Sequence, residues 1–272
     1  MATITETLPA PTVVESTLNF YSPPKDGSIP YNVVYDVPEG TPTRNYENLA
    51  QKVEIIDVRG RESEFTLDKN GFQFERRYHA FKDWSDDERI KKEYYPGVIN
   101  AIKETTGASK VIIFDNTIRT KDGYRNPVMF VHVDQTPRSA EDRVRLHSPD
   151  DADVLLSKRF QIINYWKPLA GPVEEFPLAL GDAHDMAEDD IVSVEHRYRD
   201  RTGATGGVKY NPNQKYYYLS GMTADEEVFI KCYDSRDGVA KRTPHTAFED
   251  PTSKPDALPR ESIEVRTLVF YD

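Results

Sequence analysis

The chain is acidic and long enough for a single large domain. Its 272 residues carry a formal net charge of −11 at pH 7, and no basic block offsets the acidic residues. This balance excludes nucleic acid as an expected partner. Cys232 is the only cysteine, which excludes an intrachain disulfide and a cysteine-based metal site. No run of about 18 apolar residues occurs, so no membrane span is expected. Small molecules are therefore the expected ligands.

The first residues predict a flexible tail in front of one domain. Residues 1–16 are polar and contain prolines, and they lack the basic and apolar segments of a signal peptide. We therefore expect a cytoplasmic protein with a single domain over 17–272. A short strand is predicted over 17–21, and a proline-rich loop is predicted over 23–42.

A β-hairpin is predicted over residues 64–76. Phe65 and Leu67 alternate with polar residues before the dipeptide Asn70-Gly71, and the alternation resumes after it. Asn-Gly is the preferred dipeptide of a two-residue hairpin turn.

Two consecutive helices are predicted next. The run from Ser85 to Glu88 is a capping box that opens a helix, and this helix should end or kink near Pro96. Pro96 can start a second helix that reaches Gly107. A buried strand is predicted over 111–114.

The rest of the chain is expected to be mostly strands. Short apolar stretches separated by Pro/Gly turns, without a regular strand–helix alternation, favour a sandwich or jelly roll with flanking helices. A short helix, capped by Ser148, is predicted over 149–157. The strands are predicted at 128–134, 159–166, 191–198, 215–219, 227–233, 244–248 and 262–271.

The strand at 128–134 contains the first candidate metal ligands. His132 and Asp134 are two residues apart, so in a strand their side chains share one face, with backbones roughly 7 Å apart. An imidazole and a carboxylate at this spacing can converge on one ion. A third ligand must come from elsewhere, and His245, 113 residues after His132, is the best candidate.

Two histidines and one carboxylate form the facial triad of non-haem iron(II) oxygenases, which leaves coordination positions open for a co-substrate and dioxygen. The pattern His-x-Asp alone is equally typical of a hydrogen-bonded strand histidine beside a turn-forming aspartate. His184 is the one rival ligand, because Asp182 and Asp185 flank it, but the segment reads as a loop.

Arg260 and Ser262 form a candidate clamp for a carboxylate. They follow His245 by 15 and 17 residues and share one face of the last strand with Arg266. Arginine binds a carboxylate bidentately and a serine hydroxyl adds a hydrogen bond, so the far carboxylate of 2-oxoglutarate is the expected partner. Spacing favours Arg260 over Arg266, and both remain candidates. Either arginine could instead pair with a nearby glutamate.

Five further residues are candidates for a substrate pocket. Charged or polar groups on apolar strands need a partner, and a bound carboxylate would supply one. Each has a structural alternative, such as a salt bridge between Lys231 and Asp234 or a core position for a tryptophan. The five candidates are Arg119, Asn164, Trp166, Lys231 and Tyr233.

Seven stretches resemble the CmcJ/AsaB-like family of non-haem iron(II)/2-oxoglutarate-dependent oxygenases, which includes fungal gibberellin desaturase. They are VIIFDNTIR at 111–119, VHVDQT at 131–136, IINYWKP at 162–168, YYYLSGM at 216–222, KCYDS at 231–235, PHTAF at 244–248 and PRESIEVR at 259–266.

The resemblance implies a mainly β double-stranded β-helix, a cupin-like jelly roll, with its barrel core over about 111–272. It also implies Fe(II), 2-oxoglutarate and oxidation of a secondary metabolite. By motif position, the metal roles fall on His132, Asp134 and His245, and the keto-acid clamp falls on Arg260.

Two other functions remain open from the sequence. One is an iron(II) oxidase without a keto acid, in which Arg260 and Ser262 bind the substrate's own carboxylate. The other is a β-barrel that binds small molecules and has a vestigial or zinc-binding metal site. The sequence leaves open the substrate, the oligomeric state, and the choice among hydroxylation, desaturation and ring closure.

Overall fold

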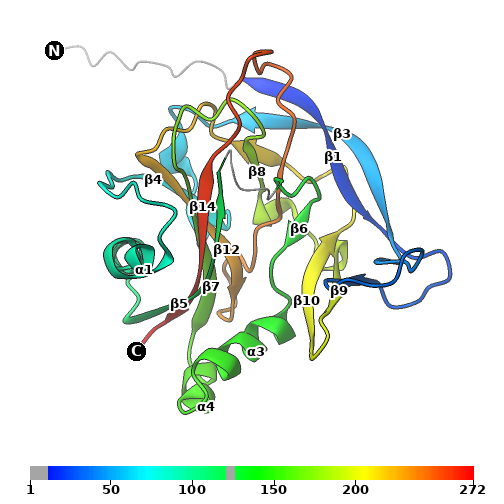
Figure 1. The fold of residues 1–272 in the computed structure, drawn as a ribbon, viewed down its shortest axis with the longest axis horizontal. Coiled ribbons are helices and arrows are strands. Elements are labelled where there is room, and N and C mark those ends of the chain that lie inside the picture. Colours follow the sequence, from blue (N-terminus) through cyan, green and yellow to red (C-terminus); the bar gives the residue numbers. More distant parts are fainter. Residues whose placement is uncertain (1–11, 121–125) are drawn as a thin grey trace.

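Two β-sheets face each other in the computed structural model, which describes residues 12–120 and 126–272 (Figure 1). The larger sheet has nine strands in the order β1-β3-β11-β8-β13-β6-β10-β9-β2, and the smaller has five in the order β4-β12-β7-β14-β5. This arrangement is the predicted jelly roll. The strands are β1 (Val13–Ser22), β2 (Tyr31–Val33), β3 (Glu47–Asp57), β4 (Phe72–Arg76), β5 (Lys110–Arg119), β6 (His132–Val133), β7 (Phe160–Pro168), β8 (Leu178–Gly181), β9 (Ile191–Arg197), β10 (Thr202–Val208), β11 (Tyr216–Tyr218), β12 (Glu226–Asp234), β13 (His245–Ala247) and β14 (Ser262–Phe270).

Side-chain alternation gives the smaller sheet two different faces. Tyr165 and Ile263 lie on the outer face and pack against helix α2 (Tyr95–Thr106). Trp166, one residue along β7, packs instead with residues of the larger sheet such as Leu180. Because strand side chains alternate, the even-numbered residues of β7 and the first half of β14 face the space between the sheets.

The N-terminal segments correct several expectations. β1 begins at Val13, so the last residues of the predicted tail 1–16 belong to a strand, while residues 1–11 lie outside the described part. β1 pairs antiparallel with β3 along its whole length. β2 and β3 were not predicted, since the first half of β3 is exposed and polar and shows no clear alternation. β1 to β4 extend the two sheets beyond the predicted core range of 111–272.

The hairpin predicted over 64–76 is wrong in its first arm. The chain forms a short 3₁₀ helix, Glu62–Glu64, and then turns, with the Phe65 amide donating to the Glu62 carbonyl. Only the second arm, β4, is a strand, and it pairs with β12. The Asn70-Gly71 turn itself is present, with φ of +87° at Gly71. Burial of Phe65 against distant aromatic rings overrides the local alternation.

The two predicted helices form one continuous segment. The Asp86 side chain caps it by accepting from the amides of Glu88 and Arg89, after which helix α1 (Asp87–Arg89), a π-turn (Ile90–Tyr94) and α2 follow without a break. Pro96 sits in the first turn of α2, directly after the π-turn. Gly107 ends α2 with φ of +73°.

Most C-terminal strands are confirmed, with differences near the candidate ligands. The strand predicted over 128–134 is shorter in the structure, where only His132 and Val133 form β6. The Val131 amide, just before it, donates instead to the Asn19 carbonyl of β1. β5 reaches Arg119 rather than ending near 114. β8 and β10 were not predicted. Helix α4 covers Ala152–Leu156 only, and Ser148 ends the preceding helix instead of capping α4.

Helix α3 (Pro137–His147) was not predicted either. Its buried residues, Ser139, Ala140 and Val144, are small, so the segment lacks a strong apolar stripe. The helix runs across one end of the space between the two sheets (Figure 1). No helix in the described part of the chain has the length and apolar character needed to cross a membrane.

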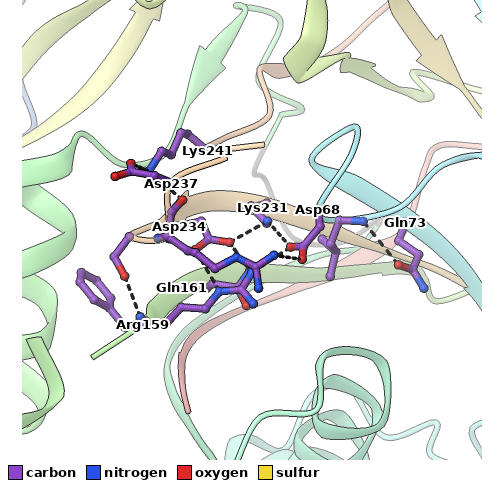
Figure 2. A network of polar contacts seen from close by, with 12 residues as sticks. Asp68, Gln73, Arg159, Gln161, Lys231, Asp234, Asp237 and Lys241 are labelled. Atoms are coloured by element: carbon purple, nitrogen blue, oxygen red, sulfur yellow. Dashed lines mark hydrogen bonds and ion pairs between the residues drawn. The ribbon is translucent and has the colours of Figure 1, made fainter. Parts of the chain in front are cut away.

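A buried ion-pair network surrounds Lys231, one of the candidate pocket residues (Figure 2). The Lys231 Nζ lies 2.8 Å from Asp234 Oδ2 and 2.9 Å from Asp68 Oδ1, and the lysine side chain is fully buried. Arg159 adds a second cation to Asp234 at 2.7 Å. Lys231 is therefore engaged in the salt bridge that the sequence left as an alternative.

We expect Lys231→Ala to lower the free energy of unfolding by about 3 kcal/mol, because it leaves buried Asp234 with one cation fewer. Lys241→Ala is the matched control, since Lys241 makes an ion pair with the fully exposed Asp237, and it should change stability by no more than about 0.5 kcal/mol. Urea unfolding of both variants measures the difference. If both variants lost the same free energy of unfolding, burial of the Lys231 ion pair would not explain its contribution to stability.

Candidate metal centre

Three side chains converge between the sheets as the sequence predicts. β6 and β13 are neighbours in the larger sheet, and the register pairs His132 directly with His245. Asp134 lies just after β6, where the chain bends toward α3. Asp134 Oδ1 is 3.3 Å from His132 Nε2 and 4.0 Å from His245 Nε2. One ligand atom from each residue lies within 4.8 Å of the others, which is compact enough to hold one metal ion.

Backbone carbonyls orient both imidazoles. His132 Nδ1 is 2.8 Å from the Phe130 carbonyl, and His245 Nδ1 is 3.1 Å from the Thr243 carbonyl. A carbonyl can only accept, so each Nδ1 carries a proton, and Nε2 is the ring atom that each histidine can offer to a metal. Burial, followed by the neighbouring His132, lowers the pKa of His245, which favours the neutral form that binds metals.

The two oxygens of Asp134 have different surroundings. Oδ2 accepts hydrogen bonds from Asn164 Nδ2 at 2.6 Å and Arg266 Nε at 3.3 Å, whereas Oδ1 faces the imidazoles. Burial alone would raise the pKa of this carboxyl, but Arg266 and the two histidines outweigh burial and hold the pKa well below its usual range. Asp134 is thus an oriented, ionised carboxylate with one oxygen left for a metal.

A narrow cavity adjoins the two histidines on the side of β14. Trp166 and Arg260 form part of its wall, with the Arg260 guanidinium carbon 5.6 Å from the centre of the indole ring. Arg260 donates to the Phe176 carbonyl, but its Nε is buried without a hydrogen-bond partner, and so is the Ser262 hydroxyl. Within the described residues, these are two buried polar groups without hydrogen-bond partners, one just before β14 and one at its first residue, and such groups are typical of a site that receives a ligand.

Charge around this cavity is predominantly positive. Arg119, Arg260 and Arg266 contribute guanidinium groups to its lining, against the single carboxylate of Glu264, which is ion-paired to Arg266. Arg119 is brought close because β5 pairs with β14 and places it opposite Ser262. Burial and then Arg119 lower the pKa of Arg260 to about 10. A bound anion would relieve this repulsion.

The structure brings together most of the predicted site residues, but not all. Arg119, Trp166, Arg260 and Arg266 line the cavity together with the two histidines, and Asn164 contacts Asp134. Lys231 and Tyr233 are not among the lining residues. Tyr233 packs on Phe160, with ring centres 5.1 Å apart.

Two features of the site were not assigned from the sequence. Glu264 shares one face of β14 with Arg266, a signal that could have identified it. The second unassigned feature is helix α3. Its start could have been recognised, because the Thr136 side chain accepts from the Ser139 amide and Pro137 occupies the first turn. The rival ligand His184 has a side chain that is 60% exposed, and the described residues contain no second cluster of possible metal ligands.

Comparisons with known proteins agree with this geometry. A family model described as an oxidoreductase/YMDC permease-like domain matches residues 18–270. The hydroxylase/desaturase efuI of Hormonema carpetanum is 34% identical over 301 residues, covering 99% of this chain and 98% of the relative. The alpha-ketoglutarate-dependent dioxygenase phiK of a fungal species is 33% identical, covering 95% of this chain and 96% of the relative.

A solved structure also matches over nearly the whole chain. The iron and alpha-ketoglutarate-dependent endoperoxidase NvfI superposes with a TM-score of 0.88 at 31% identity, covering 96% of this chain and 98% of its own. The corresponding protein nvfI of Aspergillus novofumigatus is described as an Fe(II)/2-oxoglutarate-dependent dioxygenase. The chain therefore belongs to the family of Fe(II)/2-oxoglutarate-dependent dioxygenases and hydroxylase/desaturases known from fungal secondary metabolism.

Proposed function

We propose that this protein uses Fe(II), 2-oxoglutarate and dioxygen to oxidise an unactivated C–H bond of a small secondary metabolite. The oxidation yields a hydroxylated, desaturated or ring-closed product. His132, Asp134 and His245 are the metal ligands in this proposal, and Arg260 with Ser262 binds the far carboxylate of 2-oxoglutarate. The proposal rests on one observation: three oriented ligand atoms converge beside a positively charged cavity, next to buried polar groups of Arg260 and Ser262 that have no hydrogen-bond partner among the described residues.

The ligand set suits Fe(II) better than a structural metal. Two imidazoles and one carboxylate occupy one side of an ion and leave positions open, as the facial triad of non-haem iron oxygenases does. A closed structural zinc site would need a fourth protein ligand. Within the described residues no fourth histidine, cysteine or carboxylate joins the cluster. Bound Fe(II) supplies the activation of dioxygen, coupled to decarboxylation of 2-oxoglutarate to succinate and CO₂.

Arg260 is the better clamp of the two arginine candidates. Arg266 is already bound to Asp134, Glu264 and Asp115, so its guanidinium has little capacity left for a ligand. Within the described residues, the Arg260 side chain donates a hydrogen bond only to the Phe176 backbone carbonyl and stacks over Trp166, which leaves other N–H groups of its guanidinium for a carboxylate. Arg266 is then a positioning residue that, with Asn164, holds Asp134 in place.

The protein's own contribution is positioning and the exclusion of water. The buried walls around the histidines, including Trp166 and Ala247, keep the reacting atoms away from bulk solvent. We place this activity in the cytoplasm, supported by the single buried cysteine, which a reducing compartment tolerates.

An anaerobic titration tests the proposal without knowledge of the substrate. The apo-protein is titrated with Fe(II) and then with 2-oxoglutarate while visible absorption is followed. We expect a weak charge-transfer band that requires both additions. Tight iron binding without a band would overturn the keto-acid assignment and favour the iron(II) oxidase. Absence of iron binding would favour the small-molecule binding protein.

A further inference from the structure

A second cavity reaches Asp134 from the side opposite the strands of the smaller sheet. It has a volume of about 290 Å³ and lies between α3 and the β9–β10 hairpin, with Asp134 itself in its wall. Arg260, Arg266 and Trp166, which line the cavity assigned to 2-oxoglutarate, do not line this one, so the two cavities are distinct. A volume of this size approaches that of small-molecule sites. A compound bound there would lie directly beside the metal ligands.

Two arginines of this cavity have no anionic partner in the part of the chain that the structure describes. Arg143 on α3 and Arg201 in the turn between β9 and β10 both line it. Neither lies within salt-bridge distance of a carboxylate among the described residues, whereas neighbouring Arg145 pairs with Asp153 at 3.0 Å. Burial and then Arg201 lower the pKa of Arg143, so the two guanidiniums repel each other across the cavity.

Aromatic rings hold both guanidiniums in place. Arg143 lies over Phe114, 5.2 Å from the ring centre, and Arg201 lies over Tyr198 at 3.9 Å. Stacking uses the flat face of a guanidinium and leaves its N–H edge free to donate. Aromatic stacking therefore orients both guanidinium groups, and within the described residues their N–H groups donate no hydrogen bond.

The remaining lining fits a ligand with one acidic group and an apolar body. Asp142 is the one other carboxylate besides Asp134, and it is exposed. Burial, followed by His132, lowers the pKa of His196, so this histidine is neutral near pH 7. Leu146, 60% exposed, supplies an apolar surface. Asp134 is already ion-paired to Arg266, which leaves two cations against the exposed carboxylate of Asp142 and favours an anionic ligand.

We infer that this cavity binds the organic substrate, and that Arg143 and Arg201 select substrates carrying a carboxylate. This inference rests on the proposed function, because it assumes that 2-oxoglutarate occupies the Arg260 cavity. It specifies the substrate class as a small carboxylic acid with an apolar skeleton. The acid group would be held on the α3 side, and the skeleton would extend toward the metal at Asp134.

Calorimetric titration of Fe(II)-loaded protein, kept anaerobic and saturated with 2-oxoglutarate, tests the inference. The probes are benzoate, phenylacetate and decanoate, each compared with its neutral amide. Saturating 2-oxoglutarate prevents the acids from binding at Arg260. The variants are Arg143→Gln, Arg201→Gln and the double variant. Arg145→Gln, on the same helix but already ion-paired, is the matched control.

We expect at least one acid to bind the wild type roughly tenfold or more tightly than its amide, as a charge-assisted bond predicts. Arg143→Gln should remove most of this preference, Arg201→Gln a smaller part, and the double variant all of it, while Arg145→Gln keeps it. The inference is overturned if no acid binds, if acid and amide bind alike, or if the preference survives in the double variant.

Failure of the inference can be told apart from failure of the proposed function. The charge-transfer band reports on 2-oxoglutarate and iron, and it should be unchanged in Arg143→Gln. If the band is absent in the wild type, the proposed function fails. The same acid titration on the apo-protein then still shows whether the α3 cavity prefers carboxylates.

Discussion

Asp134→Ala is expected to weaken Fe(II) binding at least about 100-fold and to abolish the charge-transfer band. The substitution removes the only anionic ligand, and loss even of an outer-shell partner of a metal site costs roughly 10- to 100-fold. It also leaves the two imidazoles as the only metal ligands, beside an Arg266 that has lost one of its anionic partners. Anaerobic titration with Fe(II), followed by 2-oxoglutarate, measures both effects.

Asp237→Ala is the control for this experiment. It also removes one aspartate, but Asp237 is fully exposed and pairs only with Lys241, so iron binding should match the wild type. Far-ultraviolet circular dichroism shows whether Asp134→Ala is folded. A folded Asp134→Ala protein that binds Fe(II) as tightly as the wild type would refute the assignment of the triad.

Arg260→Gln is expected to weaken 2-oxoglutarate binding by about 100-fold and to leave Fe(II) affinity nearly unchanged. Truncating one partner of a buried, hydrogen-bonded charge pair costs roughly 2–5 kcal/mol. Glutamine keeps much of the side-chain length but loses the charge and the bidentate fork. The concentration of 2-oxoglutarate that gives half of the charge-transfer band measures the effect.

Arg266→Gln is the informative comparison, because Arg266 lies on the same face of β14 and was the second candidate from the sequence. This arginine contacts Asp134, so its loss should weaken iron binding and change 2-oxoglutarate binding less than Arg260→Gln does. The reverse order of effects on 2-oxoglutarate would assign the clamp to Arg266. No effect of either substitution would favour the oxidase that uses no keto acid.

The local sequence was sufficient to propose the candidate metal ligands, although not to distinguish them from a structural pair. His132 and Asp134 stand two residues apart after an apolar run, a spacing that places an imidazole and a carboxylate on one side of the chain. Their convergence did not depend on a regular strand: β6 contains only His132 and Val133, yet Asp134 still reaches the histidines. His245 was identified by the motif around it, since no spacing rule predicts which distant strand will pair with β6.

Local alternation failed where long-range packing decides the conformation. Residues 64–71 alternate like a strand, but Phe65 packs against Phe72 and Tyr217, and the backbone turns to allow it. In contrast, the start near Asp86 and the end at Gly107 of the next helical segment were predicted, because caps and a terminal glycine act within one turn of the chain. The end or kink predicted near Pro96 was wrong, because the segment continues through this residue.

The sequence by itself predicted the candidate ligand types, the jelly-roll class and the two candidate arginines near the start of and within the last strand, because each depends on residue chemistry or on strand periodicity. Only the tertiary structure gives a reason to propose Arg260 rather than Arg266 as the clamp, since the choice depends on which guanidinium already has carboxylate partners from other elements. It also placed α3 beside β10 and so brought Arg143 and Arg201 together. Their 58-residue separation in the chain gives no local signal, because a helix and a hairpin turn that lie far apart in the chain meet only through tertiary packing.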